Sequence, residues 1–314
     1  MIQTVLVTGV AGFIGRTVAR YFGNLGFKIV GVDCVPHESI DLPDYIKYHQ
    51  LTLPCTELEV LLKDCSPAIC VHCAGRASVA HSISDPAPDF HAGPIMTFEL
   101  LNAIRHYANA CRVIFLSSAA VYGNPESLPV AEAHVLKPVS PYGFHKLQSE
   151  LICREFAQVY QLKVASLRIF SAYGAGLRRQ VLWDIVRKVL SPGAIMLQGS
   201  GTESRDFVHV DDIARAIHQV ASKADLCGEV YNVGSGVETS IATLVDLTIN
   251  LLSVERVCEF DGRVPPGTPL NWCADISRLQ SLGFRPTIPL SEGLANFVSW
   301  SKAEIGLRSV EPDR

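Results

Sequence analysis

The chain has 314 residues, of which 48% are hydrophobic and 18% charged, which is enough for a sizeable core and about two domains. Its formal net charge at pH 7 is −4, and no run of Lys or Arg indicates binding to nucleic acid or to an anionic membrane. No apolar stretch approaches the ~20 residues that a membrane-spanning helix needs. The first residues also lack the basic segment of a signal peptide.

The ten cysteines are scattered along the chain and stand mostly in apolar segments. Cys70 and Cys73 flank Val71 and His72 in a spacing that resembles a redox or zinc pair. In the strand predicted there, residues three apart face opposite sides of the sheet and cannot share a metal ion. The cysteines are therefore expected to be buried, reduced thiols of a cytoplasmic protein, and no metal site is predicted.

The first predicted element is a strand that leads through a glycine turn into a helix. Thr4–Thr8 is apolar and rich in β-branched residues, and Gly9, Gly12 and Gly15 follow at intervals of three. Glycine permits the positive φ of a tight turn and the close approach of a ligand, so the turn could hold a diphosphate on backbone N–H groups. The spacing is one residue longer than the usual dinucleotide fingerprint, and a glycine turn can also simply join a strand to a helix.

A second strand, at residues 27–33, favours the dinucleotide. It ends in Asp33, eighteen residues after Gly15, where a carboxylate accepts hydrogen bonds from the ribose hydroxyls of adenosine. The same carboxylate repels a 2′-phosphate, so it favours NAD over NADP. The turn, the strand and the acid together predict an NAD site.

Strand and helix signals alternate up to residue 170. Apolar runs predict buried strands at 67–75, 112–118 and 163–170, and helical spacing predicts helices around 60–62, at 95–108 and at 140–160. Ser140 as N-cap and Pro141 in the first turn mark the start of the last of these helices. Beyond residue 170 the pattern changes to a helix near 181–190, a polar segment at 199–210, a helix at 212–221 and a strand at 229–233.

This alternation is typical of an α/β fold with a Rossmann-type, doubly wound parallel sheet. Residues 1–171 are expected to form the NAD-binding domain, with residues 207–236 returning to it. Residues 172–206 and 237–314 are expected to form a smaller mixed α/β domain that binds the substrate. No flexible linker divides the two parts, so the domains should interleave.

The predicted helix at 140–160 carries the residues best suited to chemistry. Tyr142 and Lys146 stand four apart and share one helix face. A tyrosine hydroxyl has a reference pKa near ~10, and a nearby ammonium together with a cationic nicotinamide would favour the phenolate, making it a general base. The pair is a weak signal alone, but Ser118, at a strand end, could place its hydroxyl on the same substrate oxygen.

With these residues in view, the chain resembles the extended short-chain dehydrogenase/reductase family, in its nucleotide-sugar epimerase/dehydratase branch. The resemblance runs almost from end to end. The motifs that carry it are Thr8-Gly9-x-x-Gly12-x-x-Gly15, Asp33, His72-Cys73-Ala74-Gly75, Ser117-Ser118-Ala119-Ala120-Val121-Tyr122-Gly123, Pro141-Tyr142-x-x-x-Lys146, Leu167-Arg168-Ile169-Phe170-x-x-Tyr173-Gly174, Arg205-Asp206-Phe207-Val208-His209-Val210-Asp211-Asp212, Asn232-Val233-Gly234-Ser235-Gly236 and Ala274-Asp275-Ile276-Ser277.

The resemblance implies a mechanism. Tyr142 takes a proton from a sugar hydroxyl, usually at C4, while that carbon delivers hydride to NAD⁺. Ser118 hydrogen-bonds the same oxygen, and Lys146 lowers the tyrosine pKa and binds the ribose. The implied cofactor residues are Gly9, Gly12, Phe13, Ile14, Gly15, Asp33, Ala74, Gly75, Ser117, Tyr142 and Lys146, and the implied substrate residues are Ser118, Tyr142, Ser171, Arg205, Arg263 and Trp272.

Among the reactions of this branch, the residues after Ser118 favour epimerisation. The 4,6-dehydratases resembling this chain carry an Asp-Glu pair there, whereas this chain has Ala119 and Ala120. Related 4-keto reductases generally consume NADPH, against which Asp33 argues. An NAD-dependent nucleotide-sugar 4-epimerase acting on a UDP-hexose is therefore expected. The alternatives left open are a dehydratase, a 4-keto reductase, an epimerase at another carbon and a non-catalytic NAD-binding regulator.

Several positions depart from the family pattern. Gln50 stands about where an adenine-contacting Asp is usual, Gly93 replaces an Asn, and Ser171 replaces an Asn that normally touches the sugar nucleotide. The usual Arg-Pro-Gly-Asp is altered after Arg263, which displaces the second phosphate arginine, and the bulk of Trp272 would leave less room for an N-acetyl group.

Other side chains and the assembly carry weaker expectations. Asp211 or Asp212 is expected to cap the next helix rather than to join His209 at a metal, and His145 is expected to face solvent or packing. The resemblance also implies a homodimer through the helices at 95–108 and 141–160.

Overall fold

The computed structural model describes residues 2–264 and 266–308, so the last part of the predicted substrate-binding segment, beyond residue 308, lies outside the described residues. Its centre is a seven-stranded sheet in which every neighbouring pair is parallel. The strands, in sheet order, are β10 (Cys227–Val233), β6 (Lys163–Ile169), β5 (Arg112–Ser118), β4 (Ile69–His72), β1 (Thr4–Thr8), β2 (Lys28–Asp33) and β3 (Ile46–Gln50).

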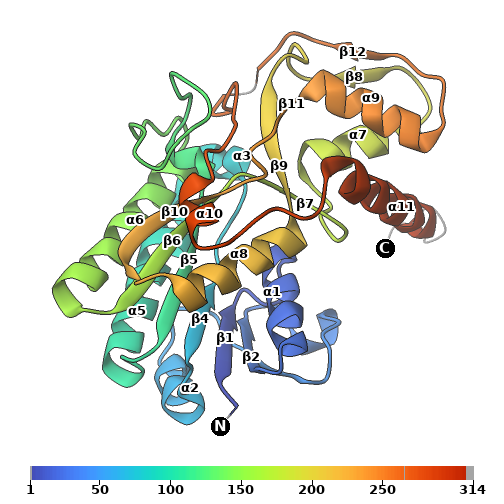
Figure 1. Cartoon of the computed structure of the whole chain (residues 1–314). Coiled ribbons are helices and arrows are strands. Elements are labelled where there is room, and N and C mark those ends of the chain that lie inside the picture. The colour runs from blue at the N-terminus through green and yellow to red at the C-terminus, as the bar shows by residue number, and fades with distance from the viewer. Residues whose placement is uncertain (1, 265, 309–314) are drawn as a thin grey trace.

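Helices cover both faces of this sheet, which is why its central strands are apolar on both sides. On one face, α1 (Phe13–Asn24) and α8 (Val210–Lys223) bury Val18, Phe22 and Ile217 against the strands. On the other face lie α2 (Glu57–Cys65), α5 (Met96–Tyr107) and α6 (Pro141–Tyr160). Figure 1 shows the three layers in the lower part of the molecule. The predicted doubly wound α/β fold is confirmed.

The longest helix, α6, begins as its sequence predicts. The Ser140 side chain accepts a hydrogen bond from the Gly143 amide at 3.2 Å, and Pro141 occupies the first turn. These contacts satisfy an otherwise unpaired amide and preset the backbone for a helix. The helix runs for 20 residues to Tyr160 and ends at Gln161, whose φ is +57°.

The upper right of Figure 1 holds a second group of elements with its own apolar core. It contains α7 (Gln180–Leu190), α9 (Ile241–Leu252) and α11 (Leu290–Arg308), with the two-stranded sheet of β8 (Ile195–Leu197) and β12 (Cys258–Phe260). A three-stranded sheet of β11 (Glu238–Ser240), β9 (Ser204–His209) and β7 (Ser171–Tyr173) connects this group to the main sheet. The short helices are η1 (His37–Ser39), α3 (Val79–Ser84), α4 (Pro86–Phe90), η2 (His91–Ile95), η3 (Ala119–Val121) and α10 (Ser277–Ser281).

The start of α8 differs from the prediction. The helix begins at Val210, and the His209 ring accepts a hydrogen bond from the Asp211 amide at 3.3 Å, so neither predicted aspartate is the cap. Asp211 instead pairs with Arg20 at 2.8 Å. The Asp212 carboxylate is buried and accepts from backbone amides of residues 287 and 288. Both carboxylates are drawn into tertiary contacts, which local capping rules do not include.

Two expectations from composition also find their place in the fold. All ten cysteines are free thiols, as expected. The expected burial is wrong for Cys34 and Cys227, which are exposed because they stand at the ends of strands, Cys34 just after β2 and Cys227 at the start of β10. Four others are partly buried, and Cys70, Cys111, Cys153 and Cys273 are buried. Within residues 2–264 and 266–308, no helix is both long and apolar enough to cross a membrane.

Candidate active site

The glycine turn lies at the carboxyl end of β1 and accepts no larger residue at two of its positions. Gly9 has a φ of +71°, and a Cβ there would lie 2.6 Å from the Ala74 nitrogen. A Cβ on Gly15 would lie 2.1 Å from the carbonyl oxygen of Gly9. Gly12, the N-cap residue of α1, donates to the same carbonyl at 3.0 Å. The backbone is thus folded tightly where the first amides of α1 are exposed to an anion.

The remaining predicted cofactor residues lie around this turn. Phe13 and Ile14 are the first residues of α1, so their amides have no acceptor within the helix. Asp33 ends the adjacent strand β2, and its Oδ2 accepts from the Ala11 amide at 2.9 Å, which fixes the carboxylate beside the turn. Gly75, just after β4, has a φ of +144° and is open on the side toward Lys146, whose Nζ would be 3.9 Å from an added Cβ.

The Ser117 side chain belongs to a buried network behind the predicted cofactor site. Its hydroxyl donates to Glu150 at 2.5 Å inside the protein. Glu150, from α6, also accepts from the Arg168 guanidinium of β6 at 2.7 Å, and both charged groups are buried. This network joins β5, β6 and α6. The predicted contact of Ser117 with the cofactor stays a prediction, and it would have to use the backbone of this residue.

The three predicted catalytic residues meet at the carboxyl edge of β5 and the first turns of α6. The Ser118 side chain accepts from the Ala120 amide at 3.2 Å and lies close enough to the Tyr142 phenol to lower its pKa. Lys146 lies on the same helix face, with Nζ 5.9 Å from the centre of the Tyr142 ring, and donates to the Leu116 carbonyl at 2.8 Å. The backbone amide of Tyr142 is held in turn by the Ser82 hydroxyl at 3.1 Å. A substrate hydroxyl between Ser118 and Tyr142 would meet both.

Burial dominates the electrostatics of this centre. Burial raises the pKa of Tyr142, and Asp89 raises it further, whereas Ser118 and Arg179 oppose the rise. Burial lowers the pKa of Lys146 to about 8, with Asp89 acting in the opposite direction. Burial therefore outweighs the groups that lower the pKa of Tyr142, and the lowering by Lys146 stays a prediction.

Asp89 and Arg179 were not identified at this centre from the sequence, whereas His145 takes one of its two expected environments, packing. Asp89, on α4, is buried and lies 2.5 Å from Nδ1 of His145, whose ring packs inside rather than in solvent. Arg179 reaches from the start of α7 to the carbonyl of Ala77 at 2.9 Å, which brings its charge near Tyr142. No local pattern identifies either contact, because each joins segments far apart in the chain.

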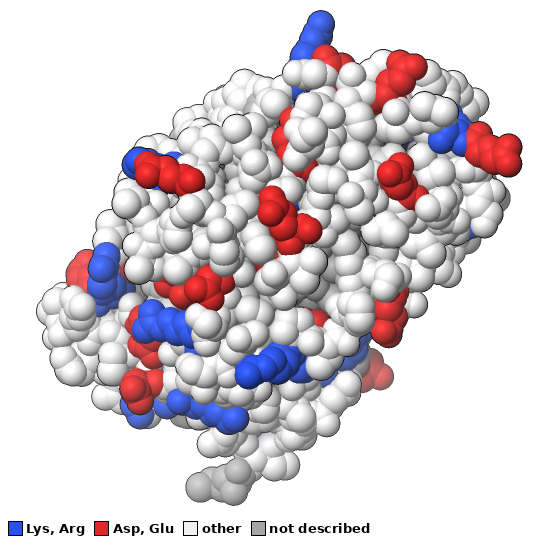
Figure 2. All heavy atoms as spheres, turned by 45° about the horizontal axis from the view of Figure 1, so that its top comes forward, with Lys and Arg blue, Asp and Glu red and all other residues white. Residues whose placement is uncertain are grey.

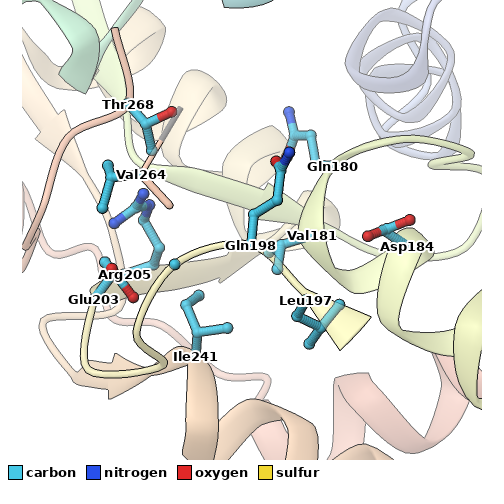
Figure 3. Close-up of a pocket in the computed structure, with 11 residues that line it drawn as sticks. Gln180, Val181, Asp184, Leu197, Gln198, Glu203, Arg205, Ile241, Val264 and Thr268 are labelled. Atoms are coloured by element: carbon cyan, nitrogen blue, oxygen red, sulfur yellow. The ribbon is translucent and has the colours of Figure 1, made fainter. Parts of the chain in front are cut away.

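A cavity of about 350 Å³ lies among the upper elements of the molecule (Figure 3). It is lined by Gln180, Val181, Asp184, Leu197, Gln198, Gly199, Glu203, Arg205, Ile241, Val264 and Thr268. Figure 3 shows Arg205 pointing toward Val264 and Thr268, on the loop that closes one side. Polar groups on an apolar lining of this size suit a small organic ligand.

Of the predicted substrate residues, Arg205 lines this cavity, and the Trp272 ring contacts its guanidinium. Arg205 donates to the carbonyls of Ser204, Pro269 and Leu270 at 2.7 to 3.0 Å, and burial lowers its pKa to about 10, so it stays charged at neutral pH. Trp272 packs below it, buried, with Nε1 donating to the Gly123 carbonyl at 3.0 Å.

The other two predicted substrate residues are less enclosed. Arg263 is exposed on the loop beside the cavity, and its amide donates to Asp261 at 2.8 Å. Ser171 is partly buried at the start of β7.

The surface around these sites carries mixed charge. On the face shown in Figure 2, Lys and Arg side chains alternate with Asp and Glu, and no broad basic area forms. This agrees with the net charge of −4 and gives no electrostatic basis for nucleic-acid binding on that face.

The glycine turn, Asp33 and the grouping of Ser118, Tyr142 and Lys146 fit one class of protein, the dinucleotide-binding enzymes. The model of the NAD dependent epimerase/dehydratase family matches residues 5–234, and the chain belongs to that family. NAD is its cofactor, since the glycine turn and Asp33 fit a dinucleotide and NAD-bound structures are among its similar proteins. The predicted NAD-dependent nucleotide-sugar epimerase is confirmed at the level of this family.

Relatives match nearly the whole chain. A putative UDP-glucose 4-epimerase of Methanocaldococcus jannaschii is 28% identical, over 95% of this chain and 98% of the relative. The structure of MoeE5 in complex with UDP-glucose and NAD is 31% identical, with a TM-score of 0.87, covering 96% of this chain and 99% of that one. UDP-glucuronic acid 4-epimerase from Bacillus cereus, in complex with UDP-glucuronic acid and NAD, is 28% identical, with a TM-score of 0.88, covering 96% and 100%.

Proposed function

We propose that the chain is an NAD-dependent 4-epimerase of a UDP-hexose. The observation that carries the proposal is the meeting of Ser118, Tyr142 and Lys146 at one end of the sheet, with Ala119 and Ala120 beside them. Ala119 and Ala120 are buried and carry no proton-transfer group. The centre therefore has a base for one hydroxyl but lacks, at these two positions, the acids that elimination of water would use.

The residues divide the reaction between them. Tyr142 accepts the proton of the C4 hydroxyl and later returns it, while Ser118 donates a hydrogen bond to the same oxygen. Lys146 holds a ribose hydroxyl and supplies a positive charge that favours the phenolate. NAD, held by the glycine turn and Asp33, would supply a reversible hydride acceptor for C4 and, in its oxidised form, a second positive charge near the phenol. No other redox partner is needed, because the electrons return to the same carbon.

The substrate is proposed to extend from Ser118 and Tyr142 to the cavity of about 350 Å³. Arg205, charged and at the wall of the larger cavity, would bind the diphosphate through charge-assisted hydrogen bonds. The similar proteins named above point to a UDP-sugar, but they differ in the sugar, since one structure holds UDP-glucose and another UDP-glucuronic acid. A dehydratase, a 4-keto reductase, an epimerase at another carbon and a non-catalytic regulator are the outcomes that an activity test must separate.

We also keep the predicted organisation as part of this proposal. Residues 1–171 and 207–236 would bind NAD, and residues 172–206 together with the part from 237 onward would bind the UDP-sugar. Exposed apolar side chains on α5 and α6, among them Phe98 and Leu151, support a homodimer through these helices. A cytoplasmic location stays a prediction from the free cysteines.

The experiment is to incubate the purified protein with UDP-glucose, UDP-galactose, their N-acetyl forms and UDP-glucuronic acid, without added NADH. The C4 epimer of one of these sugars is expected, and Tyr142→Phe should nearly abolish its formation while NAD stays bound. Tyr160→Phe, a change at an exposed tyrosine at the end of α6, is the control. A stable 4-keto-6-deoxy product, inertness toward the whole panel, or full activity of Tyr142→Phe would contradict the proposal.

A further inference from the structure

A buried carboxylate lies beside the reaction centre and takes no part in the mechanism above. Asp89 is the fourth residue of α4, and α4 packs against α6. Its side chain is 5% exposed, and Oδ2 lies 2.5 Å from Nδ1 of His145, whose side chain is 13% exposed. A carboxylate removed from water is strongly unfavourable without a partner, so His145 fixes both its position and its orientation.

The surroundings hold this pair in place. The Phe90 ring packs edge-on against the His145 ring, with centroids 5.3 Å apart and an angle of 74°. A Cβ on Gly93 would lie 3.6 Å from the Cβ of His145, at van der Waals distance, so η2 packs closely against this part of α6. The pair is therefore built into the contact between α4, η2 and α6 rather than exposed on a mobile surface.

A small cavity connects the pair to the catalytic residues. Its volume is about 10 Å³, room for about one water molecule. It is lined by Gly75, Arg76, Asp89, Ala92, Gly93, Tyr142, His145 and Lys146. Asp89, Tyr142 and Lys146 thus line one small pocket, in which charges are screened less than in bulk water.

The charged and titratable groups around this space define what Asp89 does. Tyr142 is influenced by Ser118, Asp89 and Arg179, and Lys146 by Asp89, Cys73, Cys153 and Glu150. Asp89 stands in both sets. Glu150 is compensated by its ion pair with Arg168, whereas Asp89, in contact with His145, lines the same pocket as Tyr142 and Lys146. The exposed Arg76 lines this pocket as well.

We propose that Asp89, oriented by His145, is a positioning residue for catalysis: its charge keeps Lys146 cationic and opposes the ionisation of Tyr142. The first effect preserves the donor that holds the ribose. The second lets Tyr142 return its proton to the sugar as readily as it took it, which a reversible epimerisation requires. This role rests on the proposed function of Tyr142 and Lys146.

The test is Asp89→Asn, which keeps the shape and removes the charge. Tyr142 should ionise, and Lys146 should lose its proton, at lower pH. Both limbs of the pH profile of kcat/KM should therefore move to lower pH together, by about 0.5 to 1 pH unit. His145→Gln, which keeps an N–H donor for Asp89, should stay nearer the wild type. Asp85→Asn, at an exposed aspartate just before α4, should not move the profile.

A second readout needs no turnover. Tyrosinate formation followed by ultraviolet difference absorption, with Tyr142→Phe subtracted in each background, should show Tyr142 ionising at lower pH in Asp89→Asn. This titration tests Asp89 even if none of the UDP-sugars reacts, so the two proposals fail separately. Asp89→Ser predicts the same sign if the asparagine variant does not fold. A folded variant with lower thermal stability and unmoved titration would overturn the inference.

Discussion

Lys146 and Arg205 are both partly buried cations whose hydrogen-bond partners are backbone carbonyls. Burial lowers the pKa of Lys146 to about 8 and that of Arg205 to about 10. Both therefore remain charged at neutral pH. Within the part of the chain that the structure describes, neither forms a salt bridge with a carboxylate. A cation whose hydrogen bonds go to carbonyls can still attract an anionic ligand or donate to a hydroxyl group.

At this scale, Arg205→Met is expected to weaken substrate binding more than catalysis. Hydrogen bonds to a charged partner contribute about 1.5–3 kcal/mol, so KM for the UDP-sugar should rise about 10- to 100-fold, with kcat changed much less. Steady-state kinetics measure both constants. Arg187→Met, at an exposed arginine of α7, is the matched control, and an unchanged KM in Arg205→Met would rule out the diphosphate contact.

Single elements explain how the site is assembled. The turn between β1 and α1 places helix amides at the sheet edge only because Gly9 and Gly15 let two stretches of backbone approach. The contacts of Glu150 with Arg168 and Ser117 orient α6, and through it Tyr142 and Lys146. The catalytic geometry thus depends on backbone closeness in one element and on a buried ion pair in another.

The glycine turn gives a prediction about α1. Gly15→Ala forces a Cβ against the Gly9 carbonyl, so the backbone must shift, at a cost of about 1–3 kcal/mol in unfolding free energy. Denaturant unfolding and calorimetric NAD titration should show lower stability and lost NAD binding. Gly306→Ala, in α11, is the control, since its Cβ would meet no described atom within 4 Å. Normal NAD affinity in Gly15→Ala would contradict this account of the turn.

A second prediction concerns the outer surface of α5 and α6. Leu151 is 47% exposed, and a glutamate there would place a charge in an apolar dimer contact. Leu151→Glu should therefore convert a homodimer to monomer, measured by light scattering coupled to size exclusion. Val257 stands just before β12, away from α5 and α6, and is 84% exposed. Val257→Glu should leave the mass unchanged. A dimer that persists in Leu151→Glu places the contact elsewhere.

At the scale of the whole molecule, the sheet and its helices follow from local patterns. The apolar run Thr4–Thr8, the Ser140–Pro141 helix start and the acid at Asp33 each predict their element correctly, because their causes lie within a few residues. Asp89, His145 and Arg179 could not be placed in this way. Their contacts join α4 to α6 and α7 to the loop after β4, and only the tertiary structure determines such pairs.

The side chains of Ser117, Asp211 and Asp212 also have partners that the local sequence does not predict. The Ser117 hydroxyl donates to Glu150. Asp211 pairs with Arg20, and Asp212 accepts from the backbone at residue 287, so neither aspartate caps α8. The raised pKa of Tyr142 belongs here too, because its main cause is burial. Local sequence shows which groups are present, and packing decides what they face.

The central claim is that the electrons leave C4 of the sugar and return to it within one active site. The most direct measurement uses the UDP-hexose substrate carrying deuterium at C4, followed by mass spectrometry of the epimerised product. The account predicts that the product keeps its deuterium, and that Tyr142→Phe forms almost none of it. Loss of the deuterium to solvent, or its appearance in NADH released from the protein, would contradict the account.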